Sequence, residues 1–259
     1  MKRFLSIVLG LVWMVTSVWG QRNEYPRPQF ERTEWINLNG TWTCQIDPAG
    51  SGVEKNYKNS KGFDQKIIVP FSPESKLSGV GHTDFIEHLW YHRLVNIPAE
   101  WKDKKIILNF GGVYYESEIY IDGQFVDRHF GGSSSFSVDL TDFVHPGHEH
   151  SLVVYVKSDL RNRVQPAGKQ STRHYSFVAS YTRTTGIWQT VWMEAVHPKA
   201  IKSSHVITDI DNSQIVIQPE FYGLGNTRLR VSLKEKGRLV AQETSMATEN
   251  APIVLRGVL

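Results

Sequence analysis

The chain is poor in cysteine. Its 259 residues contain a single one, Cys44, so no intrachain disulfide can form. Stability must therefore come from a packed core, and a chain of this length is long enough to bury a sizeable one. A lone cysteine acts more often as a small buried hydrophobic residue than as a reactive thiol, and we expect this for Cys44.

An excess of charge of either sign is also lacking. The sequence holds 29 Lys and Arg residues against 26 Asp and Glu residues, which gives a formal net charge of +3. The basic residues are scattered along the chain instead of forming a stripe that would neutralise successive phosphates. The composition therefore argues against a nucleic-acid partner.

Long apolar runs are limited to the beginning of the chain. Residues 4–19 are mostly apolar; two basic residues precede this run and Gly20 follows it. This order is typical of a secretory signal and predicts a signal peptide over residues 1–20 and a secreted or periplasmic protein. An uncleaved anchor is the alternative, because the run approaches the roughly 18 to 20 apolar residues that span a bilayer. After cleavage we expect no membrane contact.

Helical periodicity is scarce beyond residue 21. Short runs rich in Val, Ile, Tyr, Phe and Trp recur instead between Gly, Pro, Asn and Asp, as in residues 106–110, 151–156 and 187–196. The Asp122-Gly123 pair between two such runs predicts a tight hairpin, because both residues tolerate the positive φ of a type I′ turn. The sequence therefore predicts an all-β protein built as a β-sandwich.

The pattern of β-runs changes after Pro198. Shorter amphipathic runs follow, and we place a domain boundary at residues 198–202. About sixty residues remain, roughly half of what a seven-stranded immunoglobulin-like sandwich requires. We therefore expect a first domain over residues 21–199 and an incomplete immunoglobulin-like domain over residues 200–259.

Five phrases in the first domain carry a family resemblance. They occupy residues 38–42, 68–75, 90–93, 122–141 and 184–192. In this order they resemble the N-terminal sugar-binding domain of family 2 glycoside hydrolases, the family of β-galactosidases, β-glucuronidases and β-mannosidases. The resemblance covers residues 25–198 and implies a jelly-roll β-sandwich of the galactose-binding-domain type.

The resemblance also implies where catalysis takes place. In that family both catalytic glutamates belong to a (β/α)₈ barrel that follows the sandwich domains, and this chain ends before such a barrel begins. We therefore expect no catalytic residue here, and a non-catalytic region of an exo-acting β-glycosidase. The alternatives are a stand-alone carbohydrate-binding module and a purely structural interaction domain.

Two clusters of polar residues have a structural alternative to a catalytic or metal-binding role. Glu116 and Glu118 form the one close carboxylate pair, and retaining glycosidases hold two carboxyl groups about 5 to 5.5 Å apart, but a solvated strand face is favoured. Residues 145–150 contain three histidines and a glutamate, but the Pro-Gly among them predicts a turn. We expect neither a metal nor a cofactor.

Four tryptophans in β-runs have two possible roles. Trp42, Trp90, Trp188 and Trp192 carry faces suited to stacking on a sugar ring. Aromatic residues embedded in strands are more often part of the core, and we favour that interpretation.

The long polar loop of residues 159–184 is the strongest candidate for a functional segment. Loops of this length within a compact domain are uncommon unless they are functional or disordered. The resemblance implies that the loop reaches the barrel and helps to bind the terminal sugar, which makes a carbohydrate the expected partner. The alternative is that the loop is only a solvated connection between two strands. The sequence does not specify an oligomeric state. The predicted substrate-binding residues are Asp159, Lys169, Gln170, Tyr181 and Arg183.

Overall fold

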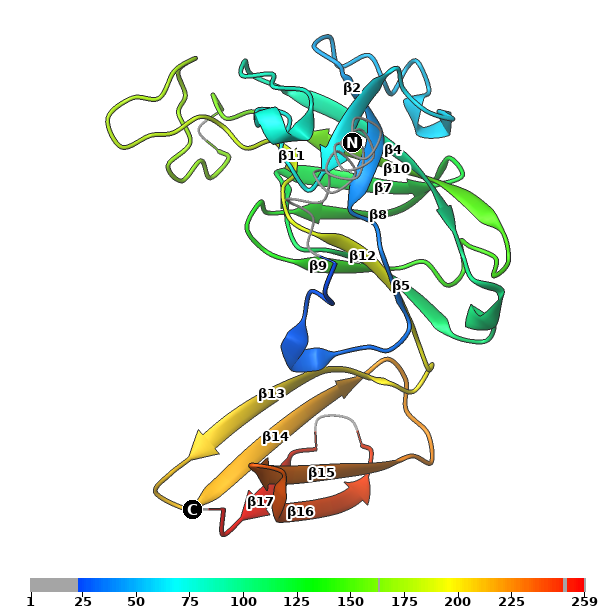
Figure 1. The fold of residues 1–259 in the computed structure, drawn as a ribbon, viewed down its shortest axis with the longest axis vertical. Coiled ribbons are helices and arrows are strands. Elements are labelled where there is room, and N and C mark those ends of the chain that lie inside the picture. Colours follow the sequence, from blue (N-terminus) through cyan, green and yellow to red (C-terminus); the bar gives the residue numbers. More distant parts are fainter. Residues whose placement is uncertain (1–22, 163, 249–250, 259) are drawn as a thin grey trace, which may run out of the picture. The chain divides into compact units, whose positions relative to one another are not determined.

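A computed structural model describes residues 23–162, 164–248 and 251–258 (Figure 1). The predicted signal peptide, residues 1–20, lies outside the described residues. The chain divides into a larger unit, Met1–Lys102 with Ile106–Ala195, and a smaller unit, Asp103–Lys105 with Val196–Leu259. In the described part of the chain, no helix has the length and apolar character needed to cross a membrane.

Antiparallel sheets make up the larger unit. One six-stranded sheet has the order β3 (Gln65–Val69), β2 (Gly40–Ile46), β4 (His88–Asn96), β10 (Glu149–Lys157), β7 (Glu116–Ile121) and β8 (Gln124–Phe130). A four-stranded sheet has the order β1 (Trp35–Asn37), β12 (Val191–Val196), β5 (Lys105–Phe110) and β9 (Phe136–Asp139). A short pair is formed by β11 (Gly186–Ile187) and β6 (Val113–Tyr114).

The main core is built by alternate residues of both large sheets. Val154 and Val156 of β10 pack in the same buried cluster as Leu108 of β5 and Met193 of β12. Because successive side chains of a strand point to opposite faces, each strand supplies every second residue to this core. The prediction of an all-β sandwich is confirmed.

The outer face of the six-stranded sheet carries a second, aromatic cluster. Trp90, Tyr120 and Val153 are buried there, and Tyr155 stacks on Trp90 with ring centroids 4.2 Å apart. Trp42 is likewise 1% exposed within the main core. The structural role expected for these two tryptophans is therefore confirmed.

The predicted Asp122-Gly123 hairpin is confirmed. It joins β7 to β8, and its two residues have φ values of 50° and 80°. The Asp122 carboxylate also accepts a hydrogen bond from the backbone N–H of Ser151 at 2.8 Å and lies 2.6 Å from Nδ1 of His150. The turn is thus tied to the neighbouring strand β10.

The histidine-rich segment is a turn before β10. Nε2 of His150 accepts a hydrogen bond from the backbone N–H of His145 at 2.9 Å. With its other ring nitrogen against Asp122, this imidazole is fully engaged within the fold. Among the described residues, no group of three or more His, Cys, Asp or Glu side chains is arranged to hold a metal ion.

The smaller unit has two sheets of its own. One has the order β13 (Ile201–Asp209), β14 (Gln214–Phe221) and β17 (Ile253–Arg256), and the other is the hairpin of β15 (Arg228–Glu235) and β16 (Arg238–Met246). Ile217, Ile253 and Leu255 are buried, whereas Val206 and Ile210 are exposed.

Candidate functional site

A cavity of about 370 Å³ lies beside the long loop predicted to be functional. Residues 166–170 of the loop form part of its wall, together with Tyr114 and Trp188. The Tyr114 hydroxyl donates to the carbonyl of Pro166, and Nε1 of Trp188 donates to the carbonyl of Gly132 at 2.8 Å. These two hydrogen bonds hold the aromatic walls of the loop cavity in place.

The structure brings together some of the predicted residues. Lys169 and Gln170 line the loop cavity. The backbone of Tyr181 pairs with this segment through two hydrogen bonds, both 2.7 Å long. Its N–H donates to the Lys169 carbonyl, and its carbonyl accepts from the N–H of Ser171. The Tyr181 side chain is 60% exposed. Asp159 instead lines a separate cavity of about 320 Å³.

Two of these side chains stabilise turns of the loop. Oε1 of Gln170 accepts a hydrogen bond from the backbone N–H of Thr184 at 2.7 Å. Oδ1 of Asp159 accepts from the backbone N–H groups of Arg161 and Asn162 at 3.1 and 3.2 Å. The Lys169 side chain, in contrast, is exposed and forms no hydrogen bond or ion pair with the described residues.

Arg183, one of the predicted substrate-binding residues, is buried and does not line the loop cavity. Its side chain is 3% exposed, and its guanidinium donates to the carbonyls of Thr83, Ser171 and Arg173. Loop carbonyls outside a sheet have no ladder partner, and buried ones require a donor. Arg183 supplies it, which is a structural role within the loop.

Glu74 is a buried acidic residue that the sequence did not single out. It is 8% exposed, and Oε2 accepts a hydrogen bond from the backbone N–H of Thr185 at 3.2 Å. Burial raises the pKa of this carboxyl, and the hydrogen bonds from Thr185 oppose the shift. Its position within the phrase of residues 68–75 was the available signal.

The Glu116 and Glu118 pair lies on the outer face of the six-stranded sheet, with side chains 16% and 20% exposed. Nε of Arg128, on the neighbouring strand, donates to Glu116 at 2.7 Å and lies 3.6 Å from Glu118. Glu118 also accepts a hydrogen bond from the Tyr120 hydroxyl. Both carboxylates are thus engaged by residues of β7 and β8.

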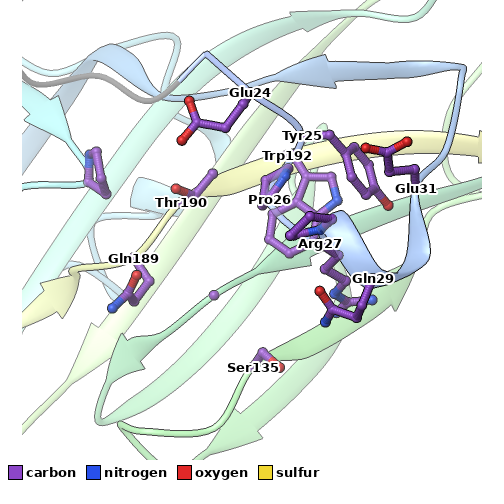
Figure 2. A pocket seen from close by; sticks show the side chains of 13 residues that line it. Glu24, Tyr25, Pro26, Arg27, Gln29, Glu31, Ser135, Gln189, Thr190 and Trp192 are labelled. Atoms are coloured by element: carbon purple, nitrogen blue, oxygen red, sulfur yellow. The ribbon is translucent and has the colours of Figure 1, made fainter. Parts of the chain in front are cut away.

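A further cavity lies elsewhere, with a volume of about 720 Å³ (Figure 2). Residues 24–31, here called the strap, form one side of it. Trp192, Gln189 and Ser135 belong to the other side. Sequence reasoning missed this strap cavity, because the strap and the strand it covers are far apart in the chain.

The larger unit is thus a two-sheet β-sandwich with cavities beside its connections. A profile described as "Glycosyl hydrolases family 2, sugar binding domain" matches residues 36–168. The chain therefore belongs to glycosyl hydrolase family 2, by way of its sugar binding domain. This confirms the family inferred from the sequence phrases.

Relatives in this family align with part of the chain. It is 27% identical over 121 residues to a β-galactosidase of Thermoanaerobacter pseudethanolicus, which covers 46% of this chain and 15% of the relative. It is 30% identical over 127 residues to the β-glucuronidase of Mus musculus, which covers 42% of this chain and 18% of the relative. The chain thus spans less than a fifth of either relative.

A solved structure shares the fold over nearly the whole chain. The crystal structure of Ruminococcus gnavus β-glucuronidase superposes with a TM-score of 0.69 and 23% sequence identity. The match covers 90% of this chain and 39% of that protein. At this identity the likeness establishes the arrangement of strands.

Proposed function

We propose that this chain is the non-catalytic sandwich region of an exo-acting β-glycosidase that hydrolyses O-glycosyl bonds. The observation that carries the proposal is the cavity beside the loop of residues 159–184, on a chain that matches a sugar binding domain. The names of the relatives, β-galactosidase and β-glucuronidase, favour one of these two activities for the whole enzyme.

The chemistry of the loop cavity is suited to sugar hydroxyls. Each sugar hydroxyl can both donate and accept a hydrogen bond. It can therefore accept one from the Lys169 ammonium or donate one to a carbonyl or amide oxygen of the loop. Tyr181, whose backbone N–H donates to the Lys169 carbonyl, adds an exposed aromatic ring on the same loop. The loop would then form one side of a terminal sugar subsite, whereas Asp159 lines the separate cavity of about 320 Å³.

The acid and the nucleophile must come from another part of the enzyme. Retaining hydrolysis needs one carboxylic acid and one carboxylate about 5 to 5.5 Å apart on either side of the bond. Glu116 and Glu118 share Arg128 on an outer strand face and are not lined up across a cleft. In this proposal the chain contributes recognition and scaffold.

The remaining parts of the chain fit the same proposal. The apolar run at residues 4–19 supports export by a signal peptide to the periplasm or the cell exterior. The five strands described in the smaller unit support an immunoglobulin-like sandwich. A stand-alone carbohydrate-binding module is the second candidate, favoured by the strap cavity, which lies apart from the loop.

Hydrolysis assays test the proposal. We expect no turnover of aryl β-galactosides or β-glucuronides by this chain alone, and turnover once it is extended with the coding sequence downstream of Leu259. Turnover by the chain alone that is lost in Glu116→Gln or Glu118→Gln would contradict it. A stop codon directly after Leu259 would favour the binding module.

A further inference from the structure

The strap cavity is built on the outer face of the four-stranded sheet. Along β12, Val191, Met193 and Ala195 belong to the main core, so Trp192 and Glu194 point to the opposite face. The strap covers this face, which leaves both side chains 2% exposed. At about 720 Å³ the cavity lies within the range of small-molecule sites, roughly 300 to 1,000 Å³.

The wall of the cavity is held in place by contacts with buried residues. The Tyr25 hydroxyl donates to Oε2 of Glu194 at 2.7 Å, and the Tyr25 ring packs edge-on against Trp35 at 5.3 Å. The guanidinium carbon of Arg27 lies 5.0 Å from the centroid of the Trp192 ring. These contacts fix the strap, so a ligand would not have to order it.

Several polar side chains around the cavity have no partner in the described part of the chain. Gln29, Gln189, Glu24 and Glu31 line it, are exposed, and make no hydrogen bond or ion pair with described residues. Figure 2 shows the side chains of Gln29, Gln189 and Ser135 around the same space. In addition, the buried indole Nε1 of Trp192 has no hydrogen-bond partner among the residues that the structure describes.

We propose that the strap cavity binds a neutral, hydroxyl-rich sugar ring. Two primary amides supply donors and acceptors, and two carboxylates supply further acceptors, which matches the mixed hydrogen bonding of neighbouring hydroxyls. The charged groups of the cavity wall are the carboxylates of Glu24 and Glu31 and the guanidinium of Arg27, which lies over the Trp192 ring. A uronic acid would bring a third carboxylate into this set and is disfavoured by charge repulsion.

This inference rests on the proposed function only in taking carbohydrate as the partner. The strap cavity and the loop cavity have no lining residue in common. Sugar binding in the strap cavity should therefore depend on Gln29 and Gln189, the two glutamines that line it. The proposed glycosidase role is tested by hydrolysis, so the two ideas fail separately.

The test is a titration of the 259-residue chain followed by NMR of its backbone and glutamine side-chain amides. The probes are the methyl β-glycosides of galactose, glucose and mannose, with glucuronate as the acidic comparison. At least one neutral glycoside should shift the Gln29 and Gln189 side-chain amides saturably. Gln189→Ala should weaken this binding about five- to tenfold, the effect of one lost hydrogen bond.

Matched variants make the result decisive. Gln124→Ala and Lys55→Ala each remove an exposed side chain that lines neither cavity, and both should bind as the wild type does. All of these variants should keep the wild-type melting temperature, because the changed side chains are exposed. Lack of saturable binding by all three neutral glycosides, wild-type affinity in Gln189→Ala, or tighter binding of glucuronate would each overturn the inference.

Discussion

The guanidinium carbon of Arg183 lies 4.3 Å from the centroid of the Phe85 ring. The same guanidinium donates to the carbonyl of Thr83 and, on the other side, to those of Ser171 and Arg173. One buried side chain thus joins the long loop to the segment that precedes β4. The shape of the loop depends on this connection.

Replacing Arg183 should therefore destabilise the larger unit. Arg183→Ala leaves buried carbonyls without donors, and we expect a loss of about 2–3 kcal/mol in the free energy of unfolding, measured by urea denaturation. Arg183→Lys should recover little of it, because one ammonium cannot reproduce the planar fork of donors. The matched control is Arg173→Ala, since that side chain is exposed. Equal stability of the Arg183→Ala variant and the control would contradict the structural role.

Gly186 requires both positive φ and free space. Its φ is +73°, and an added Cβ would lie 2.1 Å from the hydroxyl of Tyr91 and 3.0 Å from Cδ2 of Leu89, both of which are fully buried. Gly79 has a φ of +80° with nothing within 4 Å of a Cβ. We expect Gly186→Ala to cost more than about 3 kcal/mol and Gly79→Ala about 1 kcal/mol. Similar losses in the two variants would show that Tyr91 moves aside easily.

Cys44 should be an unreactive thiol in the folded protein. It is 0% exposed, and burial raises the pKa of its thiol from 9.0 to about 12. Alkylation by iodoacetamide at pH 8 should therefore require unfolding, so its rate should rise steeply with urea. Rapid modification of the native chain would contradict the burial of this residue.

The same pKa shift predicts a dependence of stability on pH. A folded pKa above the unfolded one means that the folded state keeps its proton longer, so this stabilisation is complete below about pH 9 and is lost between about pH 9 and 12. The stability difference between wild type and Cys44→Ala should shrink over that range by up to about 1.4 kcal/mol per pH unit. The comparison removes the contribution of the tyrosines, which titrate in both proteins. A constant difference would mean that the thiol titrates alike in both states.

Lys169 and Tyr181 are the loop residues best suited to separate recognition from stability. Both are exposed, so Lys169→Ala and Tyr181→Ala should change the free energy of unfolding by no more than about 0.5 kcal/mol. In the enzyme extended beyond Leu259, each should lower kcat/KM by about tenfold, the effect of one lost charge-assisted or stacking contact. Lys55→Ala is the exposed control and should leave kcat/KM unchanged. Wild-type kinetics in both loop variants would make the loop a simple connection.

The sequence by itself determined the class of fold and the family. Strand runs, the Asp122-Gly123 turn and the burial of Trp42 follow from local features, namely side-chain alternation and the φ preferences of neighbouring residues. The phrases between residues 38 and 192 were enough to indicate the family, because they follow one another in a fixed order.

Only the tertiary structure decided which polar residues face solvent and which are structural. Arg183 and Lys169 are both cations of one polar loop, yet the first is buried against carbonyls and the second lines a cavity. The strap cavity likewise depends on contacts between residues that are far apart in the chain. Tyr25 is hydrogen-bonded to Glu194, and Arg27 lies over the ring of Trp192. Contacts of this kind depend on how distant segments pack, and local propensity or periodicity carries no record of them.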